Sequence, residues 1–301
     1  MTARCEGVIG IVGLPYCGST ILSYVLGSHS KIYCGADLYK LSPNYDASCS
    51  LHGEDCNLWT RENKNSVYES LENGQRMYYD RICEITKRSI VCDASKSPGY
   101  FASRVLDVGI PVLIISLRKH PLRHICSLLF NHHLVKGVGI RGDKDVEDYL
   151  SKNWDDCMDF INNSLSRVAN HTVESRNLRE NLINSEWLEM KYEDFVTDTK
   201  DMISEAVGFF GLRFEVGQSE FERHDLHPIV GNTGPRRKFN SSHLPVKSST
   251  DIRASFYDSD ISSIQMDEKY KLVFNNEQIS KIVEIQSYRD LCDILEYPVM
   301  P

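Results

Sequence analysis

The chain has 301 residues, of which 41% are hydrophobic and 25% are charged, and its formal net charge is −8 at pH 7. A chain of this length and composition can bury a large core, which excludes a disulfide-dense miniprotein, a collagen-like or disordered chain and a coiled coil. The acidic balance argues against general nucleic-acid or membrane-surface binding, and no apolar run approaches the ~18 residues of a membrane helix. The short polar start does not have the pattern of a secretory signal, so we expect a cytoplasmic protein.

Three short apolar runs have the character of strands buried on both faces, namely 8–14, 89–92 and 112–117. The first is followed by a loop of small residues and then by helical apolar spacing from Ile21 to Leu26. Polar residues follow all three runs, and the carboxyl ends of parallel strands meet at one edge of a sheet. We therefore predict an α/β fold, a single three-layer domain over residues 1–301 in which helices flank a central parallel sheet.

The remaining elements complete this pattern. A strand is predicted at 187–192, and helices are predicted at 63–87, 122–130, 146–168, 199–210 and 276–295. Residues 232–266 are rich in Ser, Asn, Asp and Pro and have no clear period. A segment of this length inside a compact domain is typical of a lid or a flexible insertion.

Most of the ten cysteines stand singly inside apolar runs, as Cys83, Cys92 and Cys126 do. Free cysteine is among the most buried residue types, and disulfides are rare in reducing compartments. The pattern therefore predicts buried free thiols.

The segment Gly13-x4-Gly18-Ser19-Thr20 has the skeleton of a phosphate-binding loop. Backbone N–H groups at such a turn and at the following helix N-terminus converge on an anion. An NTPase loop would carry Lys where Ser19 stands, and that lysine is missing. The alternative is a tight strand-to-helix turn in which the glycines serve geometry alone.

Four segments, in chain order, resemble the sulfotransferase family. Segment 13–22 resembles the family's 5′-phosphosulfate loop, and segment 118–127 resembles its 3′-phosphate motif. Segment 190–195 resembles the family's Y-E-D-L element, and segment 227–232, with Arg236 and Arg237, resembles its late G-N-x-x-R element. The resemblance implies the P-loop-NTPase-like sulfotransferase fold.

The resemblance also implies an activity and its donor. The family moves a sulfuryl group from 3′-phosphoadenosine 5′-phosphosulfate to a hydroxyl or amine without a metal, leaving 3′,5′-adenosine bisphosphate. A P-loop small-molecule kinase and a catalytically inactive nucleotide-binding scaffold are the alternatives. The missing lysine at Ser19 and the lack of a clear acidic pair for Mg²⁺ weaken the kinase interpretation.

Donor binding would use the loop and the later motifs. The residues implied are Pro15, Tyr16, Cys17, Gly18, Ser19, Thr20, Arg118, Lys119, Ser127, Tyr192, Asn232, Arg236 and Arg237. Alignment on Pro121 favours Lys119 for the 3′-phosphate, whereas alignment on the strand favours Arg118. Consecutive side chains at a strand end point to opposite sides, so one of the two should face the phosphate.

Catalysis needs a base and a positive charge near the transferred group. Asp37, in Cys34-Gly-Ala-Asp37, resembles the segment of protein-tyrosine sulfotransferases that carries their acidic base candidate, and Asp93 is the second choice. Tyr16 stands where the family has Lys or Arg and brings no charge at neutral pH, so Lys96 would carry it alone. An ordinary surface aspartate is the alternative for Asp37 and for Asp93.

The acceptor is less constrained by the sequence. A small metabolite fits best, with its pocket near the 146–168 helix and the 232–266 segment. The acidic balance is compatible with a cationic acceptor, although a solvated acidic surface is the simpler explanation.

Cys49-x2-His52-x3-Cys56 is a further pattern of interest. Its spacing could begin a zinc site, but a closed structural site needs four ligands, and Cys34 could be the fourth only by folding back. The stretch also resembles a structural Cys-rich segment that follows the first helix in some bacterial sulfotransferases. Structural thiols or a Cys49–Cys56 link are therefore favoured, and no metal ligand is predicted.

Overall fold

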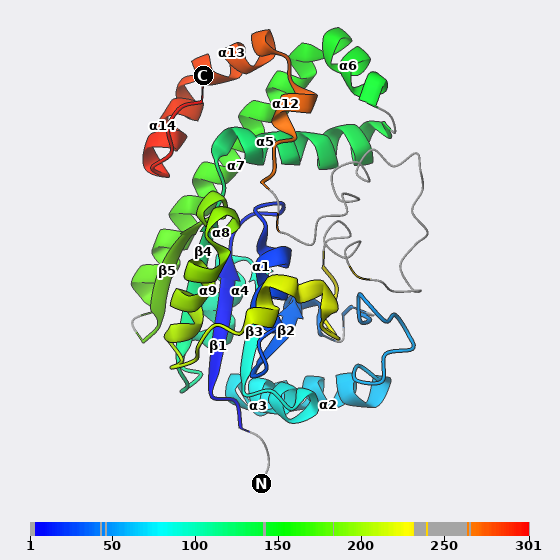
Figure 1. Ribbon diagram of the computed structural model, residues 1–301, viewed down its shortest axis with the longest axis vertical. Coiled ribbons are helices and arrows are strands. Elements are labelled where there is room, and N and C mark those ends of the chain that lie inside the picture. Colours follow the sequence, from blue (N-terminus) through cyan, green and yellow to red (C-terminus); the bar gives the residue numbers. More distant parts are fainter. Residues whose placement is uncertain are drawn as a thin grey trace.

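Five parallel strands form the central sheet, in the order β2-β3-β1-β4-β5 (Figure 1). The strands are β1 Gly7–Val12, β2 Ile32–Ala36, β3 Ile90–Lys96, β4 Val112–Arg118 and β5 Glu186–Lys191. This computed structural model describes residues 4–42, 44–45, 47–140, 143–182, 184–231, 239, 264 and 266–300. The predicted α/β class and the parallel sheet are confirmed.

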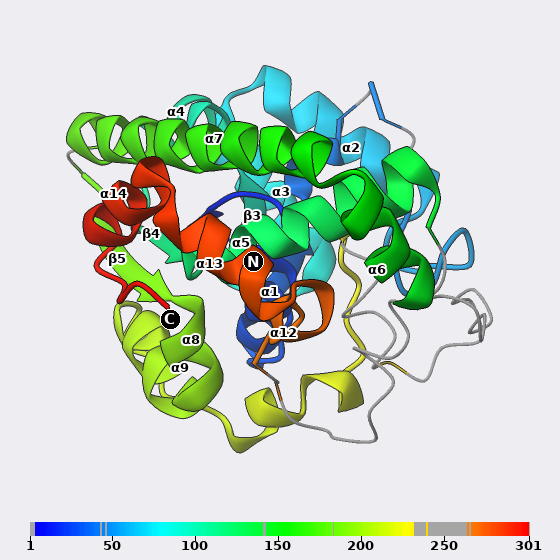
Figure 2. The ribbon, with the colours of Figure 1, turned by 90° about the horizontal axis from the view of Figure 1, so that it is seen from above.

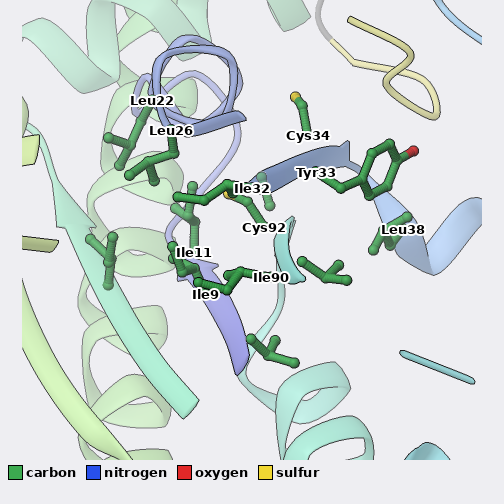
Figure 3. Packing of buried hydrophobic residues seen from close by; sticks show 14 of the residues in the cluster. Ile9, Ile11, Leu22, Leu26, Ile32, Tyr33, Cys34, Leu38, Ile90 and Cys92 are labelled. Carbon is green, nitrogen blue, oxygen red and sulfur yellow. The ribbon is translucent and has the colours of Figure 1, made fainter. Parts of the chain in front are cut away.

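β1 lies at the centre of the sheet, and every one of its residues is buried. Ile9 and Ile11 pack with Ile90 and Cys92 of β3 (Figure 3). A β-carbon at Gly10 would lie 2.7 Å from the Ile114 side chain, so the small residue permits close packing of β1. A charge-free, β-branched run is what a strand buried on both faces requires.

Helices cover both faces of the sheet (Figure 2). The helix α1 packs on β2 and β3 and also touches α9, while α4 packs against the long helix α7 on the opposite face. The described α-helices are α1 Ser19–Gly27, α2 Arg61–Glu72, α3 Gln75–Thr86, α4 Pro98–Val105, α5 Pro121–Leu128, α6 Asp143–Lys152, α7 Trp154–Asn181, α8 Tyr192–Thr197, α9 Thr199–Gly208, α12 Tyr270–Val273, α13 Asn276–Glu284 and α14 Gln286–Ile294. Two 3₁₀ segments, η1 Leu38–Lys40 and η3 Val216–Arg223, and a π-helix, η2 Leu129–Val138, complete them.

Three predicted helices are each two helices in the structure. The predicted 63–87 helix breaks at Gly74, whose φ of +107° ends α2 before α3 begins. The predicted 146–168 helix breaks at Asn153, and the predicted 276–295 helix breaks at Ile285, which has an extended backbone. Strand β2 was not predicted. The predicted lid, 232–266, lies outside the described residues except for Phe239, Ile264 and Met266.

The strand order places the loop after β1 at the switch point of the sheet, where successive connections run to opposite flanks. The chain runs from β1 to β2 and β3 on one flank and then crosses to β4 and β5 on the other. Ligands of open α/β sheets bind in the crevice at such a switch point. Among the described residues, no helix is long and apolar enough to cross a membrane.

Candidate active site

The loop between β1 and α1 closes tightly. The Gly13 N–H donates to the Lys96 carbonyl at 3.1 Å, and the Cys17 N–H donates to the Leu14 carbonyl at 3.2 Å. Gly18 has a φ of +103°, and a β-carbon there would lie 2.5 Å from the ring of Tyr192. Glycine is therefore required at position 18 both by conformation and by the close approach of Tyr192.

The predicted loop residues surround the start of α1. Ser19 and Thr20 are its first two residues and are buried, and Cys17 is completely buried. Burial raises the pKa of the Cys17 thiol, which disfavours the thiolate form. A helix N-terminus reached by a loop of small residues is suited to an anion.

Lys119 and Ser127 lie together beside this loop. The Lys119 ammonium donates to the Tyr16 carbonyl at 3.3 Å and to Ser127 Oγ at 3.2 Å, and it lies 5.0 Å from the centre of the Tyr192 ring. Ser127 lies on α5, where Pro121 occupies the first turn and the His120 side chain accepts from the Leu122 N–H. The helix that begins at Pro121 therefore brings Ser127 back to Lys119, eight residues earlier in the sequence.

Arg118 points away from this group. Its guanidinium pairs with the Glu189 carboxylate of β5 at 2.7 Å. The structure thus separates the two candidates for the 3′-phosphate as the alternation along a strand requires, with Lys119 on the side of the loop.

The carboxylate of Asp267 binds to the cationic site formed by Lys119 and its neighbours. Asp267 Oδ2 accepts from the Lys119 ammonium, from Ser127 Oγ at 2.9 Å and from the Lys269 ammonium at 3.1 Å. Burial alone would raise the pKa of Asp267, but the two ammonium groups outweigh it and hold this pKa well below its usual range. The arrangement binds an anion, and the chain supplies one.

Next to the loop lies a pocket of about 620 Å³. Asp37, directly after β2, and Lys96, the last residue of β3, form an ion pair in its wall. Lys40 approaches the other oxygen of Asp37 at 3.5 Å, and the Lys96 ammonium also donates to the Ala94 carbonyl at 3.1 Å. Tyr16 and Pro15 form the loop side of the same pocket.

The backbone around the pocket is strained. Tyr16, Ala36 and Lys96 have φ values of +70°, +49° and +72°, in the left-handed region that non-glycine residues rarely adopt. Each belongs to the pocket or directly precedes a pocket residue. Strain of this kind persists where the surrounding structure fixes a functional geometry.

Asp93 is fully buried behind this wall, and the pocket lining within the described residues does not include it. Its Oδ1 accepts from the Ser95 N–H at 3.0 Å and from the Ser95 hydroxyl. Burial raises the pKa of Asp93 to about 6, although the Ser95 hydrogen bonds oppose the shift. Asp93 therefore supports β3 and Ser95, while Asp37 faces the pocket.

Two helices contribute five pocket residues that were not predicted from the sequence. The π-helix η2 contributes His132 and Lys136, and α7 contributes Arg167, His171 and Glu174. The His132 ring packs edge-on against Tyr16 at 5.2 Å, and the His171 ring nitrogen Nε2 lies 3.4 Å from the Lys96 carbonyl. Burial lowers the pKa of both histidines. The i, i+4 and i+7 spacing of the α7 residues was the available signal, because it places them on one face.

His124, on α5, contacts the loop between β1 and α1 through a hydrogen bond to its backbone. Its Nε2 lies 2.9 Å from the Pro15 carbonyl, to which it donates, and burial lowers the pKa of His124 to about 3. A neutral ring at this position fixes the loop without adding charge. The three remaining predicted donor contacts, Asn232, Arg236 and Arg237, lie outside the described residues.

A five-stranded parallel sheet flanked by helices, with a phosphate-binding-type loop at its switch point, is the P-loop-like α/β fold. A sequence profile of the sulfotransferase family matches residues 9–216. The chain therefore belongs to the sulfotransferase family.

Two solved structures are similar to this chain at low sequence identity. The sulfotransferase domain from the curacin biosynthetic pathway superposes with a TM-score of 0.60 at 17% identity, covering 99% of this chain and 100% of that domain. The sulfotransferase domain of the Synechococcus PCC 7002 olefin synthase gives a TM-score of 0.48 at 15% identity, covering 99% and 97% of the two chains. At this level of sequence identity, the similarity to the curacin-pathway domain shows a shared fold and nothing further. No curated protein sequence matches the chain.

Proposed function

We propose that the protein is a sulfotransferase that uses 3′-phosphoadenosine 5′-phosphosulfate as donor and a small molecule as acceptor. One observation carries the proposal: the group formed by Lys119 and Ser127 already binds a carboxylate, that of Asp267, beside the loop. Charge-assisted hydrogen bonds of the same kind would hold a phosphate. Membership of the sulfotransferase family supports this donor over a nucleoside triphosphate.

The parts of the site divide the work of transfer. The loop N–H groups at the start of α1 would bind the 5′ end of the donor, and Lys119 and Ser127 its 3′-phosphate. The donor supplies an activated sulfuryl group and a stable leaving group. Lys96 would balance the negative charge that develops on the leaving oxygen, since Tyr16 brings none.

Asp37 is the proposed base. The acceptor hydroxyl or amine would lose its proton to the Asp37 carboxylate as its oxygen or nitrogen bonds to sulfur and the bond from sulfur to the donor's 5′-phosphate oxygen breaks. The ion pair with Lys96 holds the Asp37 carboxylate in the wall of the pocket. Positioning and charge stabilisation supply most of the rate in such in-line transfers, and a resident metal is not needed.

The pocket lining bears on the acceptor. The basic residues Lys40, Lys96, Lys136 and Arg167 outnumber the acidic residues Asp37 and Glu174. This balance suits the anionic donor and does not favour a cationic acceptor. Tyr16, Tyr39 and Tyr100 add aromatic surface to the same wall. The proposed acceptor is therefore a small molecule with an apolar body and one hydroxyl or amine.

Thermal unfolding with 3′,5′-adenosine bisphosphate, with Mg-ATP or without ligand tests the donor. A ligand at 100 times its dissociation constant adds about 2.7 kcal/mol, which raises the midpoint by several degrees. We expect a shift with the bisphosphate in the absence of added Mg²⁺. A shift with Mg-ATP alone would favour a kinase. Bisphosphate binding without sulfate transfer to any of a panel of phenols, alcohols and amines would favour a scaffold.

A further inference from the structure

Four metal-binding side chains meet outside the active site. The ligand atoms of Cys49, His52, Cys56 and His227 all lie within 4.8 Å of one another. Cys49 Sγ lies 3.4 Å from His52 Nδ1, and Cys56 Sγ lies 3.3 Å from His227 Nδ1. Ligand atoms around a tetrahedral zinc ion, with bonds of about 2.0–2.3 Å, stand about 3.3–3.8 Å apart.

The fourth side chain of the cluster is His227, and not Cys34, which was the fourth ligand considered from the sequence. Cys34 Sγ lies 3.2 Å from Ser23 Oγ inside the core. His227 comes from a segment 171 residues beyond Cys56 and enters the cluster through local backbone pairing. The Ser50 N–H donates to the Pro228 carbonyl at 2.9 Å, and Cys49 bridges Ile229 in antiparallel fashion.

The surroundings of the cluster orient its ligands. Both histidines turn Nδ1 toward the sulfur atoms and Nε2 toward one carboxylate, that of Asp225, at 3.1 Å from His52 and 3.4 Å from His227. The Trp59 N–H donates to Cys56 Sγ at 3.3 Å. A carboxylate behind a histidine and an N–H on a thiolate are the outer contacts that zinc sites use to fix tautomer and charge.

The chemistry of the four donors selects the metal. Two thiolates and two imidazoles in a tetrahedral array suit Zn²⁺, and the two negative charges balance the ion. Cys49 and Cys56 are 1% and 4% exposed, and the protein fills all four positions, so no place is left for a substrate. All ten cysteines, which lie within the described residues, are free, so the Cys49–Cys56 link considered from the sequence is not formed.

We infer that Cys49, His52, Cys56 and His227 form a structural zinc site. Zinc would replace the two thiol protons, which pass to solvent, and would join the 49–56 loop to the 225–229 segment. This second segment also supports the active site, because the Asp37 N–H donates to the Ile229 carbonyl at 3.2 Å and the Ile229 N–H donates to the Gly35 carbonyl at 3.2 Å. The metal would thus fix the backbone that presents Asp37.

Metal analysis of the full chain, purified under reducing conditions without chelator, is the first test. We expect about one zinc per chain and, after exchange into Co²⁺, the visible absorption of a tetrahedral cobalt-thiolate site. Alkylation should spare Cys49 and Cys56 in the zinc-bound protein relative to the chelated protein. Failure of the reduced chain to retain or take up zinc, or recovery of Cys49 and Cys56 as a disulfide, would overturn the inference.

Variants locate the ligands independently of any donor or acceptor. His227→Gln should lose zinc, whereas His224→Gln, whose ring bonds the Gly217 carbonyl at 2.9 Å, should keep it. Asp225→Asn alters an exposed carboxylate and is expected to fold, with zinc affinity lowered by about 10–100-fold. Glu54→Gln, which alters an exposed carboxylate of the 49–56 loop, is its control. Undiminished zinc affinity in both His227→Gln and Asp225→Asn would contradict the assignment.

Discussion

The carboxylate of Asp267 lies on the ammonium of Lys119, in a buried position beside the loop. Burial lowers the pKa of Lys119, and the charge of Asp267 opposes this change. The group that would bind the donor's 3′-phosphate is therefore filled by the chain itself. Under the proposed function, the 3′-phosphate of the donor would displace the Asp267 carboxylate from Lys119.

Asp267→Asn should bind 3′,5′-adenosine bisphosphate more tightly, by about tenfold or more, because the ligand no longer competes with a charge-assisted contact. The free variant should unfold at a lower temperature, because removing one partner of a buried ion pair costs about 3–5 kcal/mol. Calorimetric titration and thermal unfolding measure the two effects. Glu268→Gln, at the neighbouring and more exposed carboxylate, is the control, and equal effects from both variants would refute competition at Lys119.

Lys119→Met should weaken bisphosphate binding by about 10–100-fold, since a hydrogen bond to a charged group contributes about 1.5–3 kcal/mol. Arg118→Met, on the opposite side of the strand end, should change the affinity by less than about twofold, since its partner is Glu189. Titration of both variants under the same salt conditions compares them. The reverse order of effects would place the 3′-phosphate at Arg118.

Asp37→Asn should lower kcat by about 100-fold or more while leaving bisphosphate affinity almost unchanged, because a general base contributes about 10²–10⁴ to the rate. Glu174→Gln changes the other carboxylate of the pocket lining and serves as the matched control. Single-turnover transfer of labelled sulfate is the measurement. Full activity in Asp37→Asn together with loss in Glu174→Gln would move the base to α7.

Asp93 should make stability depend on pH. Its pKa of about 6 in the folded protein lies above the ordinary value of 3.8, so the folded state keeps a proton that the unfolded state has lost between about pH 4 and pH 6. Stability falls as pH rises through this window, by about 3 kcal/mol in all, and the full cost applies above pH 6. Asp93→Asn should lack this slope in denaturant titrations from pH 4 to pH 7. Parallel curves for the two proteins would show that Asp93 does not titrate there.

Most of the sheet could be predicted, because three apolar runs indicated β1, β3 and β4, and the 187–192 segment indicated β5. β2, Ile32–Ala36, was missed because it is short and contains Cys34 and Gly35, neither of which favours a strand. Its burial comes from packing against α1 and β3, which the local sequence does not encode. The helix breaks at Asn153 and Ile285 were missed for a related reason, since the apolar spacing continues across both.

Some residues of the candidate site could also be predicted from the sequence, and others could not. Lys96 and Lys119 could be proposed because they stand at the ends of predicted strands, and strand ends meet at one edge of a sheet. Asp37 could be proposed only from the resemblance of its segment to the family, since β2 was not predicted. His132, Arg167 and His171 reach the pocket from helices, and their positions depend on how η2 and α7 pack. His227 joins Cys56 from far along the chain, so short-range spacing could not indicate it.

The order of the strands also determines when this site can exist during synthesis. β1 leaves the ribosome first but pairs with β3 and β4, which begin at residues 90 and 112, and β5 at the far edge begins at residue 186. Non-local pairing of this kind is slow and leaves unpaired strand edges exposed until late. A nascent chain that ends before Lys119 holds the loop but lacks the lysine beside it, so the proposed donor would gain its contact with Lys119 only after β4 is made.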